Sequence, residues 1–235
     1  YFQTVKGGGH GDYRLITLAP ASVQEMADFV ALGFDLAFKY NNPAIILADG
    51  IIGQMMEKVV LPPFRPRRTE EEIRKQMPWA TQGKLAGHKR NVITSLELDP
   101  AIMEENNIRF QAKYRKIEEA EVRYEEIGCE NADYLMIAFG SMARICLKTQ
   151  EMALAEGIKV GVLRPITLWP FPSKIIAEYA NKVKGMISVE LNAGQMVEDI
   201  RLAVNGKVKV EHFGRLGGIV PTPDEVLNAL KQKLM

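Results

Sequence analysis

Three side chains that can carry out acid, base and anion chemistry lie within five residues of each other in one glycine-rich stretch: His10, Asp12 and Arg14. A histidine transfers protons near neutral pH, a nearby carboxylate orients its imidazole, and an arginine binds a carboxylate or phosphate through two hydrogen bonds. The spacing predicts a loop that lines a site. It equally suits a turn histidine beside a surface ion pair, and the residues alone leave both interpretations open.

The glycines of this stretch let the backbone adopt positive φ and approach a bound group closely; they are Gly7, Gly8, Gly9 and Gly11. The run fits neither of the common nucleotide-binding loops, because it precedes an apolar segment where both of those motifs follow a strand and open a helix. A second glycine-rich loop, 214–218, does follow a predicted strand and precede a predicted helix. Its Arg215 suits an anion, and a tight strand-to-helix connection is the alternative.

The remaining polar candidates are interpreted as structural. We expect Ser141 to cap a helix rather than act as a nucleophile, since no triad spacing surrounds it. His212 lies in an alternating strand, and we expect it and His88 to be structural. Cys129 and Cys146 form no pair with ligand spacing, so no metal site and no iron-sulfur cluster is expected in this chain.

Composition excludes several classes of partner. Thirty basic and 29 acidic residues leave a formal charge of +1, which argues against binding to nucleic acid or to a membrane surface. No apolar run approaches the roughly 20 residues that span a bilayer. Two isolated cysteines suit a reducing compartment, and we expect a cytoplasmic protein.

The first elements to position the candidate loop form a predicted βαβ unit. Residues 15–19 read as a buried strand, Ser22 begins a helix that continues to about Tyr40, and residues 44–48 read as a second strand parallel to the first. Ligands of such sheets bind beyond the carboxyl ends of the strands. Residues 49–53 are therefore expected near any site.

The middle of the chain has a different character. Prolines between residues 61 and 68 rule out a helix or central strand, and no regular period follows up to residue 91. Residues 101–127 are rich in charge with sparse apolar positions at helical spacing, which predicts one long solvated helix.

The last third predicts a second α/β unit with four parallel strands near residues 134–139, 158–163, 185–191 and 208–213. Asn192 is expected to cap the helix that ends near residue 204, and Thr222 with Pro223 to begin the last helix. We therefore predict an α/β protein with two doubly wound parallel sheets, divided into residues 1–60, a connecting segment at 61–128 and residues 129–235.

Several longer motifs occur in one order along the chain: GGGHGDYR at 7–14, LAPASVQEM at 18–26, Asp49-Gly50, AGQMVED at 193–199 and GRLGG at 214–218. In this order they resemble the alpha-type subunit of thiamine diphosphate-dependent 2-oxoacid:ferredoxin oxidoreductases, most closely the branched-chain, 2-oxoisovalerate type. The resemblance implies that residues 1–60 are the C-terminal part of a pyrimidine-binding domain and that residues 129–235 form a domain similar to the transketolase C-terminal domain.

The same resemblance implies oxidative decarboxylation of a 2-oxoacid to an acyl-CoA, with electrons passed to ferredoxin. Thiamine diphosphate and Mg²⁺ are shared with a beta subunit, and iron-sulfur clusters belong to gamma and ferredoxin-like partners. His10, Asp12 and Arg14 become catalytic candidates, and Gly8, Gly9, Gly11 and Arg215 become candidates for binding thiamine diphosphate or coenzyme A. The family's activating glutamate has no counterpart here. The chain opens on Tyr1 without Met, and we expect it to be an N-terminally truncated fragment.

Two alternatives to this resemblance remain. One is an E1 beta-like subunit of a thiamine-dependent 2-oxoacid dehydrogenase, which needs no ferredoxin-like partner. The other is a non-catalytic, two-domain α/β interaction protein in which the glycine loop merely turns the chain.

Overall fold

The computed structural model describes residues 1–81, 83, 87, 89–94 and 96–235; His88 lies outside these residues. The elements run in this order: α1 (Phe2–Val5), η1 (Gly7–Gly9), β1 (Ile16–Leu18), α2 (Val23–Tyr40), β2 (Ala44–Ile46), α3 (Gly50–Gln54), α4 (Glu70–Gln76), α5 (Pro100–Ala120), β3 (Tyr124–Ile127), β4 (Tyr134–Ile137), α6 (Gly140–Ala155), β5 (Val160–Pro165), β6 (Thr167–Trp169), α7 (Ser173–Tyr179), β7 (Gly185–Glu190), α8 (Met196–Val204), β8 (Lys209–Gly214) and α9 (Pro223–Leu234).

The first sheet has the order β2-β1-β6 and begins with the predicted βαβ unit. Strands β1 and β2 are parallel, and α2 connects them. The hydroxyl of Ser22 accepts a hydrogen bond from the Glu25 N–H, so the predicted start of α2 is confirmed. Strand β6 was not predicted. It follows β5 in the chain but pairs antiparallel with β1, so the C-terminal part of the chain supplies a strand to the first sheet.

The second sheet has the order β3-β5-β4-β7-β8. The four predicted strands are parallel, which confirms that part of the fold. The predicted helix over 101–127 is wrong at its end, because α5 stops at Ala120 and residues 124–127 form β3, antiparallel to β5. Pairing with the exposed edge of β5 outweighs the helical preference of the two glutamates in this segment.

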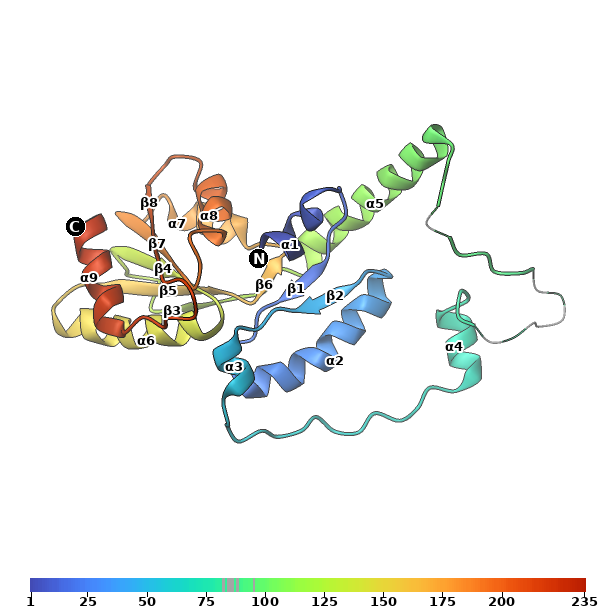
Figure 1. The fold of residues 1–235 in the computed structure, drawn as a ribbon, viewed down its shortest axis with the longest axis horizontal. Coiled ribbons are helices and arrows are strands. Elements are labelled where there is room, and N and C mark those ends of the chain that lie inside the picture. The colour runs from blue at the N-terminus through green and yellow to red at the C-terminus, as the bar shows by residue number, and fades with distance from the viewer. Residues whose placement is uncertain (82, 84–86, 88, 95) are drawn as a thin grey trace.

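Helices cover both faces of the second sheet, as Figure 1 shows. On one face Met136 and Val162 pack against α6 and α9, and on the other Leu135 and Leu163 pack against α7 and α8. Successive strand residues point to opposite faces, which is why the inner strands β4, β5 and β7 are mostly apolar. A third core joins α2, α5 and the first sheet around Phe29, Ile117, Leu168 and Trp169.

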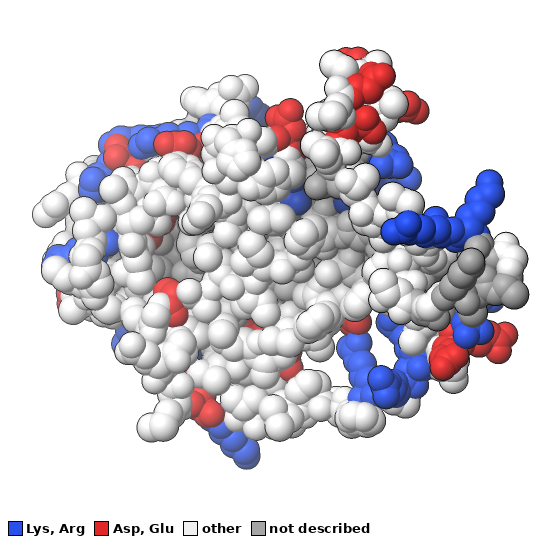
Figure 2. Space-filling model, turned by 45° about the vertical axis from the view of Figure 1, so that its right-hand side comes forward, with Lys and Arg blue, Asp and Glu red and all other residues white. Residues whose placement is uncertain are grey.

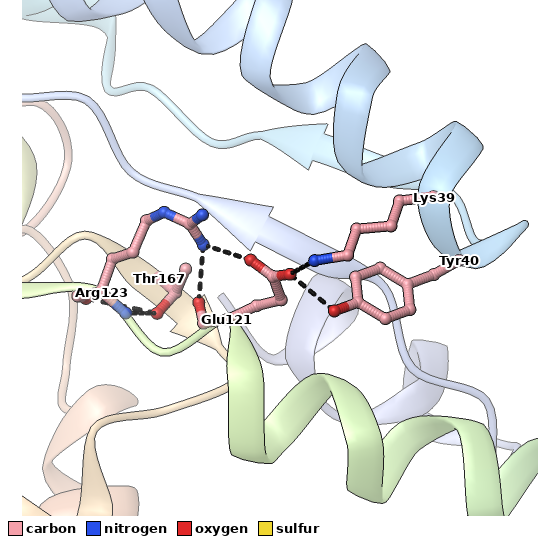
Figure 3. A network of polar contacts seen from close by, with 5 residues as sticks. All are labelled: Lys39, Tyr40, Glu121, Arg123 and Thr167. Atoms are coloured by element: carbon pink, nitrogen blue, oxygen red, sulfur yellow. Dashed lines mark hydrogen bonds and ion pairs between the residues drawn. The ribbon is translucent and has the colours of Figure 1, made fainter.

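A polar network ties the end of α5 to α2 and β6 (Figure 3). The buried Glu121 carboxylate accepts hydrogen bonds from Lys39 Nζ at 2.7 Å, Tyr40 Oη at 2.6 Å and Arg123 at 2.9 Å. The backbone N–H of Arg123 in turn donates to Thr167 Oγ1. Burial acts to raise the pKa of Glu121, but the hydrogen bonds from Lys39, Tyr40 and Arg123 outweigh it and hold the pKa below its ordinary value.

The connecting segment starts as an extended stretch, residues 55–68, that runs outside both sheets between α3 and α4 (Figure 1). It contains α4, which the sequence reasoning missed. Thr69 and Glu72 form a complete capping box at the start of α4, a signal that the surrounding prolines obscured. In the described part of the chain, no helix is long and apolar enough to cross a membrane.

Candidate functional site

The glycine loop that carries the candidate residues is a tight, left-handed turn. Gly7, Gly8 and Gly9 have φ of 60°, 62° and 81°, values that only glycine adopts readily. A Cβ on Gly8 would lie 2.2 Å from the Tyr13 hydroxyl. The glycines are therefore required for the loop to close around the Tyr13 side chain, which is a structural reason for their presence.

The three chemical candidates lie on this loop without forming a relay. His10 and Asp12 are exposed and Arg14 is half-buried. The His10 ring packs edge-on against Tyr13, with 5.9 Å between the ring centroids, and Arg14 donates to the Tyr13 carbonyl at 3.0 Å. Gln111 of α5 donates to the Asp12 carbonyl and fixes the loop against that helix. The role of these side chains in a site stays a prediction.

A cavity of about 280 Å³ opens at the carboxyl ends of β2, β4 and β7. Strands β4 and β7 are neighbours whose following helices, α6 and α8, cover opposite faces of the sheet. This is the switch point at which open α/β sheets bind their ligands. The residues that line this switch-point crevice are Tyr1, Leu47, Ala48, Asp49, Phe139, Met142, Val189, Glu190, Leu191, Asn192 and Gln195. Asp49 was expected near a site, whereas Glu190 was not singled out by sequence reasoning.

Asp49 joins the two halves of the chain through its carboxylate. One oxygen accepts from the N–H groups of Ile51 and Ile52 at the start of α3, both at 3.1 Å. The other accepts from the N–H of Ser141 at 2.7 Å, in the first turn of α6. The prediction that Ser141 caps this helix is wrong, because α6 begins at Gly140 and its N-cap is Phe139, two residues before Ser141. The carboxylate that binds its first turn comes instead from Asp49, which follows β2 of the other sheet.

Glu190 performs the same task for α8. Its buried carboxylate accepts from the N–H groups of Gln195, Met196 and Val197 at 2.8–3.1 Å and from the Ser188 hydroxyl at 2.7 Å. The prediction that Asn192 caps α8 is wrong, because its side chain accepts instead from the Gly194 N–H within the turn. Because Glu190 lies at the end of β7, several residues before α8, the sequence shows no N-cap residue at the usual position directly before the helix.

These contacts define the electrostatic character of the crevice. Helix N-termini carry positive partial charge and commonly bind phosphate, but here two carboxylates of the chain already occupy them. His212 lies on β8 next to Glu190. Its Nε2 atom is 4.0 Å from the Glu190 carboxylate, and this atom has no hydrogen-bond partner within the described structure. Burial lowers the pKa of His212, and Glu190 partly opposes that effect. The crevice therefore suits a neutral or hydrogen-bond-donating group better than a phosphate.

The second glycine loop places Arg215 beside α9. Its guanidinium donates to Glu225 Oε1 at 2.6 Å, so the charge expected to bind an anion already has a carboxylate partner. Both side chains are about one-third exposed. Within the described residues, no group of three or more His, Cys, Asp or Glu side chains is placed to hold a metal ion.

The chain matches two family profiles in succession. Residues 3–128 match the family described as pyruvate flavodoxin/ferredoxin oxidoreductase, thiamine diphosphate-binding, and residues 132–226 match core domain II of pyruvate:ferredoxin oxidoreductase. The first match covers more than half of the chain.

Individual relatives carry related names. The chain is 46% identical over 232 residues to ketoisovalerate oxidoreductase subunit VorB of Methanothermobacter thermautotrophicus, covering 99% of this chain and 64% of that protein. It is 31% identical over 249 residues to 2-oxoglutarate synthase subunit KorA of Methanothermobacter marburgensis, covering 95% and 65% of the two chains. The chain thus spans somewhat less than two-thirds of the length of these relatives.

A solved structure has the same fold. The structure described as 2-oxoglutarate:ferredoxin oxidoreductase from Magnetococcus marinus with 2-oxoglutarate, coenzyme A and succinyl-CoA bound aligns with a TM-score of 0.78 and 24% identity. The alignment covers 100% of this chain and 44% of that one. The similarity extends over both sheets and the connecting segment.

Proposed function

This chain belongs to the pyruvate flavodoxin/ferredoxin oxidoreductase family, and on that basis we propose that it is a subunit of a 2-oxoacid:ferredoxin oxidoreductase. The assembled enzyme decarboxylates a 2-oxoacid oxidatively, forms an acyl-CoA and passes electrons to ferredoxin. Within the chain, we propose that residues 1–60 belong to a pyrimidine-binding domain, 61–128 connect it, and 129–235 form the second domain.

The observation that carries this proposal is the 46% identity to a ketoisovalerate oxidoreductase subunit over 99% of the chain. Identity to the 2-oxoglutarate synthase subunit is 31%. The difference favours a branched-chain 2-oxoacid, such as 2-oxoisovalerate (3-methyl-2-oxobutanoate), over the dicarboxylic 2-oxoglutarate.

The described residues do not by themselves form a cradle for thiamine diphosphate. In the glycine loop, the N–H groups of Gly9, His10 and Gly11 donate to carbonyls of the same loop. At the switch-point crevice, Asp49 and Glu190 occupy the helix N-termini. Because neither place offers a vacant anion site, we propose that a partner beta subunit holds the diphosphate and Mg²⁺.

We propose that the loop supplies one wall of the shared site. Gly8, Gly9 and Gly11 bring the backbone close to the cofactor, and the exposed His10 moves a proton or binds a polar group of the substrate, with Asp12 and Arg14 beside it. Arg215 binds coenzyme A in the assembled enzyme, which requires it to leave Glu225. Gamma and ferredoxin-like subunits carry the iron-sulfur clusters, and the enzyme is cytoplasmic.

The test uses the complete heteromer. Reduction of a viologen dye is expected to require both 2-oxoisovalerate and coenzyme A, to stop when thiamine diphosphate is removed, and to be slower with 2-oxoglutarate or pyruvate. Dye reduction that persists without thiamine diphosphate contradicts the proposal. Dependence on lipoamide in place of ferredoxin or dye supports the E1-type alternative.

The His10 role has its own experiment. His10→Ala is expected to lower kcat by about 100-fold, the usual range for a residue that transfers a proton. The unfolding midpoint should stay near that of the parent, because the side chain is exposed. Lys207→Ala, in an exposed turn before β8, is the matched control. Equal activity of both variants removes His10 from the site.

A further inference from the structure

Residues 55–68, between α3 and α4, form an extended segment whose backbone and side chains are held by hydrogen bonds. We call it the docking segment. Gln24 of α2 holds the Val60 backbone from both sides, accepting from its N–H at 2.8 Å and donating to its carbonyl at 2.9 Å. Arg65 binds both carboxylate oxygens of Asp35 on α2. These contacts define the course of the segment along the outer side of α2.

The start of the docking segment is fixed in the same way. The Glu57 carboxylate accepts from the Val23 N–H at 3.0 Å and pairs with Arg144 of α6 at 2.6 Å. Backbone N–H binding and the guanidinium together lower the pKa of Glu57, so it is ionised at neutral pH. The segment is thus attached to both halves of the molecule.

The large apolar side chains of the docking segment nevertheless contact almost nothing. Met56 is 99% exposed, Phe64 93%, Leu61 77% and Val60 69%. Isolated exposed apolar residues are ordinary, but four in one short, anchored stretch indicate a surface that another molecule covers. Their exposure cannot be attributed to a free chain end, since the backbone is held on both sides of them.

Prolines restrict the backbone of the same stretch to an extended conformation, which favours binding. Pro62, Pro63 and Pro66 restrict φ to the extended region, and they flank Phe64. An extended segment that is already ordered loses little conformational entropy on association. This is how proline-rich segments bind aromatic-lined grooves of other proteins.

The charge of the docking segment indicates a partner surface with acidic side chains. The docking segment contains Lys58, Arg65, Arg67 and Arg68 against one acid, Glu57, a local net charge of +3 in a chain whose formal charge is +1. Figure 2 shows Lys and Arg side chains gathered on the right-hand side of one face of the molecule, while the middle of that face is mostly uncharged. A symmetric contact between two copies of the segment brings like charges together and is disfavoured.

We propose that the docking segment inserts into a groove on the partner beta subunit, a groove lined by aliphatic or aromatic side chains and rimmed by Asp and Glu. Phe64 and Met56 are the apolar anchors, and Arg67 and Lys58 face the acidic rim. The identity of that partner rests on the proposed function, whereas the chemistry of the groove follows from the segment itself.

The experiment measures the dissociation constant of the purified heteromer, from the concentration dependence of its assembly by mass photometry. Phe64→Glu is expected to weaken assembly by about tenfold or more, as loss of a buried aromatic anchor does. Arg67→Glu should weaken it less and should reduce the dependence of assembly on salt. Leu202→Glu on α8, where the leucine is 77% exposed, is the matched control and should leave assembly unchanged.

The outcomes separate the two proposals. Because Phe64 contacts almost nothing in the free chain, its variant should unfold at the parent midpoint, so a folding defect does not imitate the effect. An unchanged dissociation constant for Phe64→Glu overturns the docking proposal even if the heteromer oxidises 2-oxoisovalerate. Self-association of the free chain that Phe64→Glu abolishes also overturns it. If Phe64→Glu weakens assembly while the parent heteromer has no 2-oxoacid activity, the result supports docking and refutes the proposed function.

Discussion

Replacing Glu190 with glutamine removes a charge from the N-terminus of α8 while keeping the size of the side chain. In the parent, Oε2 accepts from Gln195 and Met196, and Oε1 accepts from Val197 and Ser188. A glutamine that keeps its oxygen at the Oε2 position turns its NH₂ group toward the Val197 N–H. The Ser188 hydroxyl can rotate to accept a hydrogen bond, but the Val197 N–H cannot.

The expected loss of stability follows from these contacts. One buried backbone N–H left without an acceptor costs about 1–3 kcal/mol. Losing the negative charge at the helix N-terminus costs about 0.3–2 kcal/mol more, toward the upper end because Glu190 is only 1% exposed. We therefore expect Glu190→Gln to lower the free energy of unfolding by about 2–5 kcal/mol.

Urea unfolding followed by far-UV circular dichroism measures this change. The matched control is Glu198→Gln, the same substitution in the first turn of α8 at an exposed position, with an expected loss under about 0.5 kcal/mol. If Glu190→Gln unfolds within about 0.5 kcal/mol of the parent, the carboxylate does not support α8 in the way described.

Three other measurements probe the same structure. Gly140 has φ of 61° and a Cβ there would lie 2.6 Å from Asp49 Oδ2, so Gly140→Ala should lower the unfolding free energy by about 2 kcal/mol, and by less when Asp49→Ala is also present. If the losses of the two single variants simply add in the double variant, the two positions do not clash. Burial lowers the pKa of His212, so its contribution to stability is complete above about pH 6.5 and is lost as the pH falls toward the folded-state pKa. His212→Gln should therefore weaken the pH dependence of the unfolding midpoint below about pH 6.5, and an unchanged pH dependence refutes the assignment. Burial raises the pKa of Cys129 to about 11 and also raises the pKa of Cys146, so neither thiol should react with a disulfide reagent at neutral pH until the chain unfolds. Rapid labelling of the native protein would contradict the burial of these thiols.

Local signals predicted much of the fold. Ser22 and Thr222 begin their helices as expected, since an N-cap requires only residues within one turn of it. The apolar runs that became β1, β4 and β7 were recognised because buried parallel strands are continuous in hydrophobicity. The candidate site was predicted less completely: Asp49 was expected near a site, whereas Glu190 was not.

The amino-acid sequence by itself determined the α/β class, the four parallel strands and the starts of α2 and α9, because each depends on neighbouring residues. Only the tertiary structure decided that Asp49 supports α6 and that Glu190 supports α8, because the carboxylates and the N–H groups they bind lie on different elements. It also decided β3 and β6, since a short edge strand exists only where a partner strand is available.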